Sequence, residues 1–322
     1  MLNNANNELI PFYSAAYTRS FLTCCYEQSA IEQPKTKGFQ TCYSFIYHLK
    51  HGQLYIEQAH QSPMDIKPML LFYGLVQFLK TLILTKDPTY PANSQVLSHG
   101  VTTRKRKKSG FTFLSDEIKI QKHGLFPHFL CQMFHMKHLD KDKFLMDQLL
   151  KQLPNMASLF TTFDYPKYLV KGSYKPHCIE FPSTLLDSYH MTSNRFEQYI
   201  QYSTQPWSKK GASIAETNQT LMIPISNKPL QTNSFFPFVH NDKSTPFLFL
   251  HRGEHAHLPE ILIHYLLLYN LSMICRYETE WWGEVLHTFD GHDLPFITRY
   301  IDLASKRIPD LIVQMLTKNQ IS

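Results

Sequence analysis

A short polar stretch at residues 251–257 carries the residue types best suited to chemistry. It reads HRGEHAH and combines three histidines and a glutamate with Arg252. Imidazole and carboxylate groups are common ligands of transition metals. However, His255 and His257 are two residues apart, so they would point to opposite sides of a strand and would share a helical face poorly. We therefore predict no metal site and no cofactor.

The same stretch has the spacing of a ribonuclease motif. Four residues separate Arg252 from His257, which fits the R-x4-6-H motif of metal-independent ribonucleases of the HEPN superfamily. In that chemistry the cation stabilises phosphorane charge while the histidine transfers a proton. Gly253 inside the motif and Pro259 after it favour a loop or a helix entry instead. A polar segment before a core helix explains the same residues, so both interpretations stay open.

A run of basic residues forms the second candidate site. The 322-residue chain has 32 Lys and Arg against 26 Asp and Glu. Removing the five cations of the run from a net charge of +6 leaves +1, so the basic character is concentrated there. The run consists of Arg104, Lys105, Arg106, Lys107 and Lys108. Such a run attracts phosphate or an acidic surface in a salt-sensitive way, although a solvated loop explains it equally well.

Two residues just before the basic run, His99 and Gly100, are predicted to shape its entry. Glycine tolerates a positive φ angle, and a neutral histidine donates one hydrogen bond. Further along, Arg276 follows an apolar stretch and precedes Tyr277 and Trp281. The helix dipole and stacking on Tyr or Trp would hold this arginine, which favours a structural role. The alternative is a ligand or partner contact made by these three residues.

Several classes of protein lose support because their motifs are missing. The chain has no G-x-x-x-x-G-K-[ST], G-x-G-x-x-G, H-E-x-x-H or G-x-S-x-G sequence. None of its six cysteines forms a C-x-x-C pair, and the N-terminus lacks the pattern of a signal peptide. The apolar stretch 258–275 carries Glu260, His264 and Asn270, which favours a core helix over a membrane span. We expect a cytoplasmic protein with reduced cysteines.

The elements that must position these residues follow from apolar periodicity. With 43% hydrophobic and 18% charged residues, the chain can bury a sizeable core. The predicted helices cover 12–27, 43–60, 66–85, 144–153, 259–277, 280–287, 294–305 and 309–316. A short hairpin is predicted from 111–113 to 117–121 across Leu114, Ser115 and Asp116, with the basic run in a loop before it. Residues 164–244 favour small strands and long loops.

These elements predict an α+β fold that is mainly α, with helical N- and C-terminal blocks around a smaller, irregular, β-containing middle. We divide the chain into 1–160, a helical region with the basic run and hairpin, and 161–322, the irregular middle followed by the C-terminal helices. A single compact unit is the alternative.

Four segments together resemble the YaaC-like family of bacilli and related Firmicutes. The segments are PMLLFYGL at 68–75 with Leu79-Lys80, HGVTTRKRKK at 99–108, FTFLSDEIKIQKHGLF at 111–126, and LSMICRY at 271–277 with the Trp pair after it. The resemblance spans most of the chain. It supplies no assigned chemistry, so no catalytic residue is carried over.

The resemblance implies a functional context. Members in bacilli are commonly encoded beside IMP dehydrogenase, which implies a physical or regulatory link to that enzyme, and the helical layout is loosely similar to HEPN-like proteins. We therefore expect a non-enzymatic interaction or regulatory protein of purine nucleotide metabolism. Its residues 104–108 would contact an acidic partner surface or a nucleotide phosphate. The alternatives are a HEPN-like ribonuclease using Arg252 and His257, and a nucleic-acid-binding module using the basic run beside Phe111 and Phe113.

Overall fold

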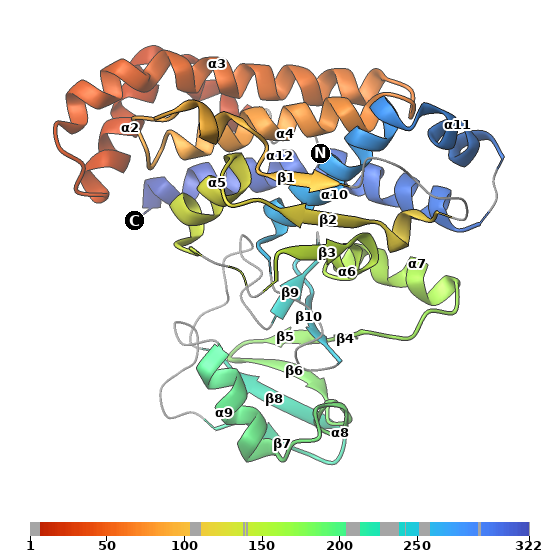
Figure 1. The fold of residues 1–322 in the computed structure, drawn as a ribbon. Helices are drawn as coiled ribbons and strands as arrows, with labels where there is room; N and C mark the ends of the chain where they lie inside the picture. The colour runs from red at the N-terminus through yellow and green to blue at the C-terminus, as the bar shows by residue number, and fades with distance from the viewer. Residues whose placement is uncertain are drawn as a thin grey trace. The chain divides into compact units, whose positions relative to one another are not determined.

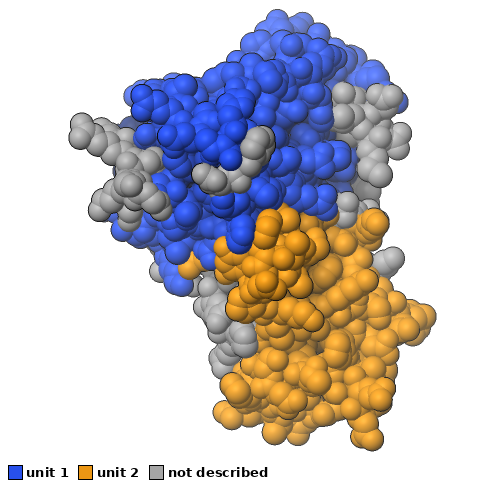
Figure 2. Space-filling model, turned by 90° about the vertical axis from the view of Figure 1, so that its right-hand side faces the viewer, with its two compact units in different colours: residues 1–147, 261–322 blue, residues 148–260 orange. Residues whose placement is uncertain are grey.

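The computed structural model divides the chain into two compact units. Unit 1 comprises residues 1–147 and 261–322, and unit 2 comprises residues 148–260 (Figure 2). The residues described are 7–103, 111–137, 139, 141–203, 213–225, 238–241, 243–250, 258–288 and 291–321. The fold is mainly helical with a small β-containing middle, which confirms the predicted fold class. The division differs from the predicted 1–160 and 161–322 because the C-terminal helix packs against N-terminal helices.

Long helices form the body of unit 1. They are α2 (Ala15–Gln28), α3 (Pro34–Gln61), α4 (Lys67–Ile83), α5 (Leu125–Phe134), α10 (Glu260–Tyr277), α11 (Thr279–His287) and α12 (Asp293–Ile321), with the 3-10 turns η1 (Ile10–Tyr13) and η2 (Ser94–Leu97). In Figure 1, α3 and α4 run side by side, and α2 packs against α3. The helices predicted at 12–27, 66–85, 259–277 and 280–287 correspond to α2, α4, α10 and α11.

Helix α3 begins nine residues earlier than its predicted start at Tyr43, because Pro34 occupies the first turn. Gly38 allows close packing on α2: a Cβ atom there would lie 2.7 Å from the Thr23 hydroxyl oxygen. The buried side of the helix includes Phe45 and Leu49. Its other side remains exposed, and it bears large aromatic residues.

Helix α10 is buried at every residue from Ile261 to Ser272. Its polar side chains have partners: the Asn270 amide donates to the Asp116 carboxylate at 2.7 Å, and the His264 ring lies 3.4 Å from the Tyr300 hydroxyl. These contacts explain how polar residues fit an apolar core. Among the helices of the described residues, none has the length and apolar character that crossing a bilayer requires.

Helix α12 is continuous, so the two separate helices predicted at 294–305 and 309–316 are wrong. Pro309 lies inside this helix. Proline has no N–H and its ring displaces the carbonyl four residues earlier, which here belongs to Ser305. That backbone carbonyl accepts a hydrogen bond from the His60 side chain. A side chain from α3 thus replaces the missing helical donor, and the helix runs on.

The small sheet of unit 1 differs from the predicted hairpin. Its antiparallel order is β1 (Val101–Thr103), β2 (Glu117–Ile120) and β3 (Lys143–Leu145). Residues 113–115 form a 3-10 turn, η3, because Phe113 and Leu114 turn inward and the Phe113 amide donates to Asp293 at 2.8 Å. Strand β2 therefore pairs with β1, which precedes the basic run, and with β3, instead of with residues 111–113. Strand β3 also replaces the start of the helix predicted at 144–153.

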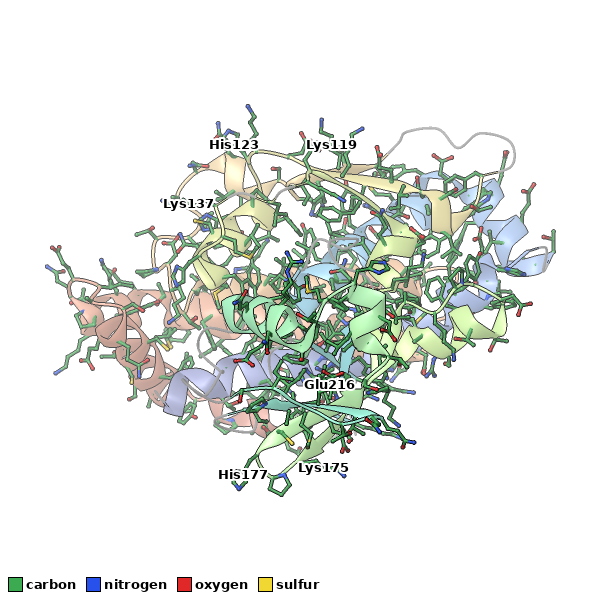
Figure 3. All side chains as sticks on the ribbon, turned by 90° about the horizontal axis from the view of Figure 1, so that it is seen from below. Lys119, His123, Lys137, Lys175, His177 and Glu216 are labelled. Carbon is green, nitrogen blue, oxygen red and sulfur yellow. The ribbon has the colours of Figure 1, made fainter. Side chains whose placement is uncertain are left out.

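Unit 2 contains small antiparallel sheets and short helices. Its strands are β4 (Leu169–Lys171), β5 (Ser173–Lys175), β6 (Cys178–Pro182), β7 (Ala215–Glu216), β8 (Thr220–Pro224), β9 (Phe238–His240) and β10 (Pro246–Phe249), ordered β4-β10-β9 and β5-β6-β8-β7. Its helical segments are η4 (Pro154–Met156), α7 (Ala157–Thr162), α8 (Leu185–Tyr189) and α9 (Ser193–Ser203), and α6 (Met146–Leu150) crosses the boundary. Lys175 and His177 extend outward from the β5–β6 turn (Figure 3).

Candidate functional site

The segment before the basic run is held against the start of α5. The Leu125 amide donates to the Ser98 carbonyl at 2.7 Å, and the Phe126 amide donates to the His99 carbonyl at 3.2 Å. The Gln121 amide donates to the Gly100 carbonyl at 2.8 Å. Backbone hydrogen bonds on three successive residues therefore fix where the His99 side chain emerges.

Two glycines make this close approach possible. Gly100 has φ +74° and Gly124 has φ +128°, a range that L side chains rarely adopt. A Cβ atom on Gly124 would overlap the Cα and N atoms of Gly100, and one on Gly100 would lie 2.6 Å from Pro127 Cδ. Both positions therefore require glycine for conformation and for space.

The His99 ring lies in a largely aromatic environment. Its centroid is 5.0 Å from that of Phe72 and 5.5 Å from that of Tyr269. The Tyr265 hydroxyl donates to the His99 carbonyl at 2.9 Å. Burial lowers the pKa of His99, and the positive charges of Arg276 and Lys80 lower it further. All three effects favour the neutral form of the ring.

Arg276 lies in the last turn of α10, where the helix dipole favours a cation. Its Nε donates to the Ser272 carbonyl at 3.0 Å, and one terminal nitrogen donates to the Tyr73 hydroxyl at 2.9 Å. The guanidinium carbon lies 5.0 Å from the Tyr277 ring centroid and 5.6 Å from that of Tyr73. Arg276 therefore lies at a helix end and stacks on tyrosine rings, which is the structural role that the sequence favoured.

The half-buried cations of this region lack acidic partners. Within the described part of the chain, no carboxylate forms an ion pair with Arg276 or with Lys80. Partial burial lowers the pKa of Lys80. We call Lys80, His99, Arg276 and Tyr73 the cationic cluster. Uncompensated, partly desolvated cations attract anions strongly, so the cluster is suited to an anionic group such as phosphate.

The aromatic neighbour of Trp281 is Phe111. Trp281 lies on α11 and packs edge-to-face on Phe111, with ring centroids 4.7 Å apart. Phe111 is the first described residue after the basic run. Trp282 is the more buried of the pair, and its indole N–H donates to the Asp65 carbonyl at 3.1 Å.

Several predicted site residues lie outside the described residues. They are Arg104, Lys105, Arg106, Lys107 and Lys108 of the basic run, and Arg252 and His257 of the ribonuclease motif. Their proposed roles stay predictions. Among the described residues, no group of three or more His, Cys, Asp and Glu side chains could hold a metal ion. All six cysteines are free thiols.

Part of the cluster was not predicted from the sequence. Tyr73 lies within the helix predicted at 66–85, and Lys80 follows it by two helical turns and thus shares its side of the helix. A second missed pair is Asp87 and His128, whose side chains lie 3.2 Å apart. The Tyr90 ring stacks on His128 at 5.5 Å. Only the Tyr73–Lys80 spacing left a signal in the sequence.

The fold and the cluster define a mainly helical α+β protein with a concentration of basic and aromatic side chains in unit 1. A family model described as YaaC-like Protein matches residues 10–316, nearly the whole chain. The chain therefore belongs to the YaaC-like family, which confirms the resemblance. No curated protein and no solved structure was found to match it.

Proposed function

We propose that this chain is a non-enzymatic interaction or regulatory protein linked to purine nucleotide metabolism. Its basic run, residues 104–108, binds a partner enzyme or a nucleotide phosphate, and IMP dehydrogenase is the candidate partner. The family membership supports this proposal through the gene neighbourhood that the resemblance implies.

One structural observation carries the proposal: His99 of the cationic cluster lies just before the basic run in sequence. Only residues 100–103 separate His99 from Arg104, and three of them form β1. An anionic group bound beside His99 would be attracted by Arg276 and Lys80, the two cations that act on the His99 ring. Neither cation has a carboxylate partner among the described residues. An external anion would offset the cost of their partial burial.

The experiment is binding of the full chain to purified IMP dehydrogenase by biolayer interferometry at low and high salt. Replacing all five basic residues of the run by Gln should weaken binding by tenfold or more and flatten its salt dependence. A matched control removes five exposed lysines elsewhere: Lys122, Lys137, Lys141, Lys167 and Lys171. Both variants lose five positive charges. A difference in affinity between them therefore reflects where the charges lie and not the net charge of the protein.

Two results would overturn the proposed contact: unchanged affinity of the run variant, or an equal loss in the control. The same titrations with a fluorescent guanine nucleotide separate binding of an enzyme from binding of a free phosphate group. RNA cleavage in EDTA that is lost in Arg252→Ala and His257→Ala variants would instead establish the ribonuclease alternative.

A further inference from the structure

The exposed side of α3 carries a row of aromatic rings. Phe39, Tyr43 and Tyr47 follow one another at four-residue intervals, and these residues are 59%, 49% and 65% exposed. Residues four apart share one side of a helix, about 6 Å apart along its axis. Tyr13 of η1 is also exposed. We call these four residues the aromatic face.

Contacts between side chains place the members of this face together. The Tyr43 and Tyr47 ring centroids are 6.3 Å apart. The Tyr13 hydroxyl donates to the Gln53 side chain at 2.8 Å, which places Tyr13 beside a later turn of α3. Single exposed apolar residues are ordinary, whereas grouped ones mark binding surfaces.

Cations accompany these rings. The Arg19 guanidinium lies 4.4 Å from the Phe39 ring centroid and donates to the Tyr43 hydroxyl at 3.4 Å. The Lys50 ammonium lies 5.4 Å from the Tyr13 ring centroid. Lys35 lies four residues before Phe39, on the same side of α3.

The charges that contact these rings are positive. Arg19 and Lys50 lie over rings of the face. Residues 9–26 and 33–56 contain neither Asp nor Glu, although Glu8, Glu27, Glu32 and Glu57 border them and balance the charge of the segment as a whole. The cations at the rings therefore favour an anionic ligand there.

We propose that the aromatic face binds single-stranded nucleic acid. Phosphates would meet Arg19, Lys35 and Lys50 while unstacked bases lie on the tyrosine and phenylalanine rings. Proteins that bind single strands without sequence preference combine these two features. This surface is separate from the basic run of the proposed function, so either can fail without the other.

The composition of the face favours nucleic acid over other occupants. Two of its three cations are lysines, which are depleted in protein–protein interfaces but bind phosphate well as point charges. A second copy of the chain would set like charges against each other, which disfavours a symmetric dimer through this face.

The test is fluorescence anisotropy of a labelled fifteen-nucleotide oligouridine with the full chain at 50 mM salt. It is run in the wild type and in the variant whose basic run is neutralised, so that the run cannot mask the face. The Tyr43→Ala/Tyr47→Ala variant should bind at least tenfold more weakly. Tyr43→Phe/Tyr47→Phe should keep the affinity because stacking needs the ring and not the hydroxyl. Thermal unfolding verifies that each variant is folded.

The phosphate contacts have their own readout. Replacing Lys35 and Lys50 by Gln should reduce the slope of log affinity against log salt by about 0.7 for each lysine. The control replaces Lys137, an exposed lysine labelled in Figure 3, and Lys167 by Gln, and it should leave the slope unchanged.

Three results would overturn the proposal. The first is the absence of binding at 50 mM salt, and the second is equal affinity of wild type and Tyr43→Ala/Tyr47→Ala. The third is ring-dependent binding of polyglutamate that exceeds the binding of oligouridine, which would point to an acidic protein instead. Retained binding of IMP dehydrogenase by the double alanine variant would show that the two surfaces act independently.

Discussion

Individual side chains in unit 1 show two opposite electrostatic arrangements. Asp87 accepts hydrogen bonds from the Thr89 amide at 3.0 Å and hydroxyl at 2.6 Å, and it pairs with His128. Arg276 and Lys80 have no such carboxylate partner in the part of the chain that the structure describes. The first arrangement contributes stability, whereas the second leaves charge available to a ligand.

The Asp87 pair should make stability depend on pH. Its hydrogen bonds, that with His128 first, lower the pKa of Asp87 below its ordinary value of 3.8. The stabilisation is therefore present above that value and is lost as the pH falls through the folded-state pKa. Asp87→Asn should cost about 1.5 to 3 kcal/mol at pH 7. In urea unfolding, its difference from wild type should shrink below pH 4.

A surface pair provides the control for this experiment. Asp142 forms an ion pair with Lys119 at 3.6 Å, with 62% of its side chain exposed. Asp142→Asn should change stability by less than about 1 kcal/mol because exposed pairs are screened by solvent. A difference for Asp87→Asn that stays constant down to pH 3 would contradict the role of its ionised form.

The coupling inside the cationic cluster can be measured by titration of His99. Arg276 contributes to the lowered pKa of His99, so Arg276→Gln should raise that pKa while burial keeps it below 6.5. The measurement is an NMR titration of the histidine rings, with the His99 signal assigned from His99→Gln. Arg299→Gln, an exposed arginine on α12, is the control. An unchanged His99 pKa in Arg276→Gln would show that Arg276 does not influence the titration of His99.

Secondary-structure elements meet at positions where one residue type is required. The approach of the Gly100 segment to Gly124 before α5 is one such position, and the Pro309 turn of α12 is another. At Gly124, glycine is required because the Gly100 segment packs directly against it. At Pro309, the Ser305 carbonyl that loses its helical donor interacts with His60 of α3.

Replacing Gly124 by Ala should destabilise the protein strongly. The φ angle of +128° alone costs about 1 to 3 kcal/mol for an L residue, and overlap with Gly100 adds to it. The control is Gly283→Ala in α11, where a Cβ atom would meet nothing within 4 Å. That change should stabilise by up to about 1 kcal/mol because alanine favours helix. Similar unfolding midpoints for the two variants would contradict this account.

A double-mutant cycle tests the link between α3 and α12. His60→Ala should cost about 0.5 to 1.5 kcal/mol because it removes the donor to the Ser305 carbonyl. In a Pro309→Ala background the alanine N–H would satisfy that carbonyl, so the cost should fall. Equal costs in both backgrounds, measured by urea unfolding, would show that the hydrogen bond does not compensate for the proline.

The whole molecule is organised as a continuous unit 2 inserted into a discontinuous unit 1. The core of unit 2 includes Ile179, Phe181, Phe196, Leu221 and Leu248, which all belong to one buried cluster. Unit 1 needs residues from both ends of the chain, since α12 packs against α3 and α4. The units should therefore differ in their ability to fold alone.

This difference predicts the behaviour of fragments. Residues 148–260 alone should unfold cooperatively, whereas residues 1–147 alone should lack fixed tertiary structure because their apolar surface has lost α10 and α12. Near-UV circular dichroism and thermal unfolding measure both, with the full chain as reference. A sharp unfolding transition in 1–147 would contradict the dependence on the C-terminal helices.

The sequence by itself determined features that depend on local pattern. Apolar residues at three- and four-residue spacing predicted α4 and α10 closely. Sequence proximity likewise anticipated that the Tyr277 ring would stack on Arg276, and short segments carried the family resemblance. These features depend on neighbours within a few turns, so their signal lies in consecutive residues.

Only the tertiary structure decided which distant residues meet. The pairing of β2 with β1, the continuity of α12 through Pro309, and the coupling of His99 to Arg276 all depend on partners far along the chain. Periodicity reports which face of an element is buried, but not which other element buries it. The cationic cluster therefore became visible only when α4, α10 and the His99 segment were packed together.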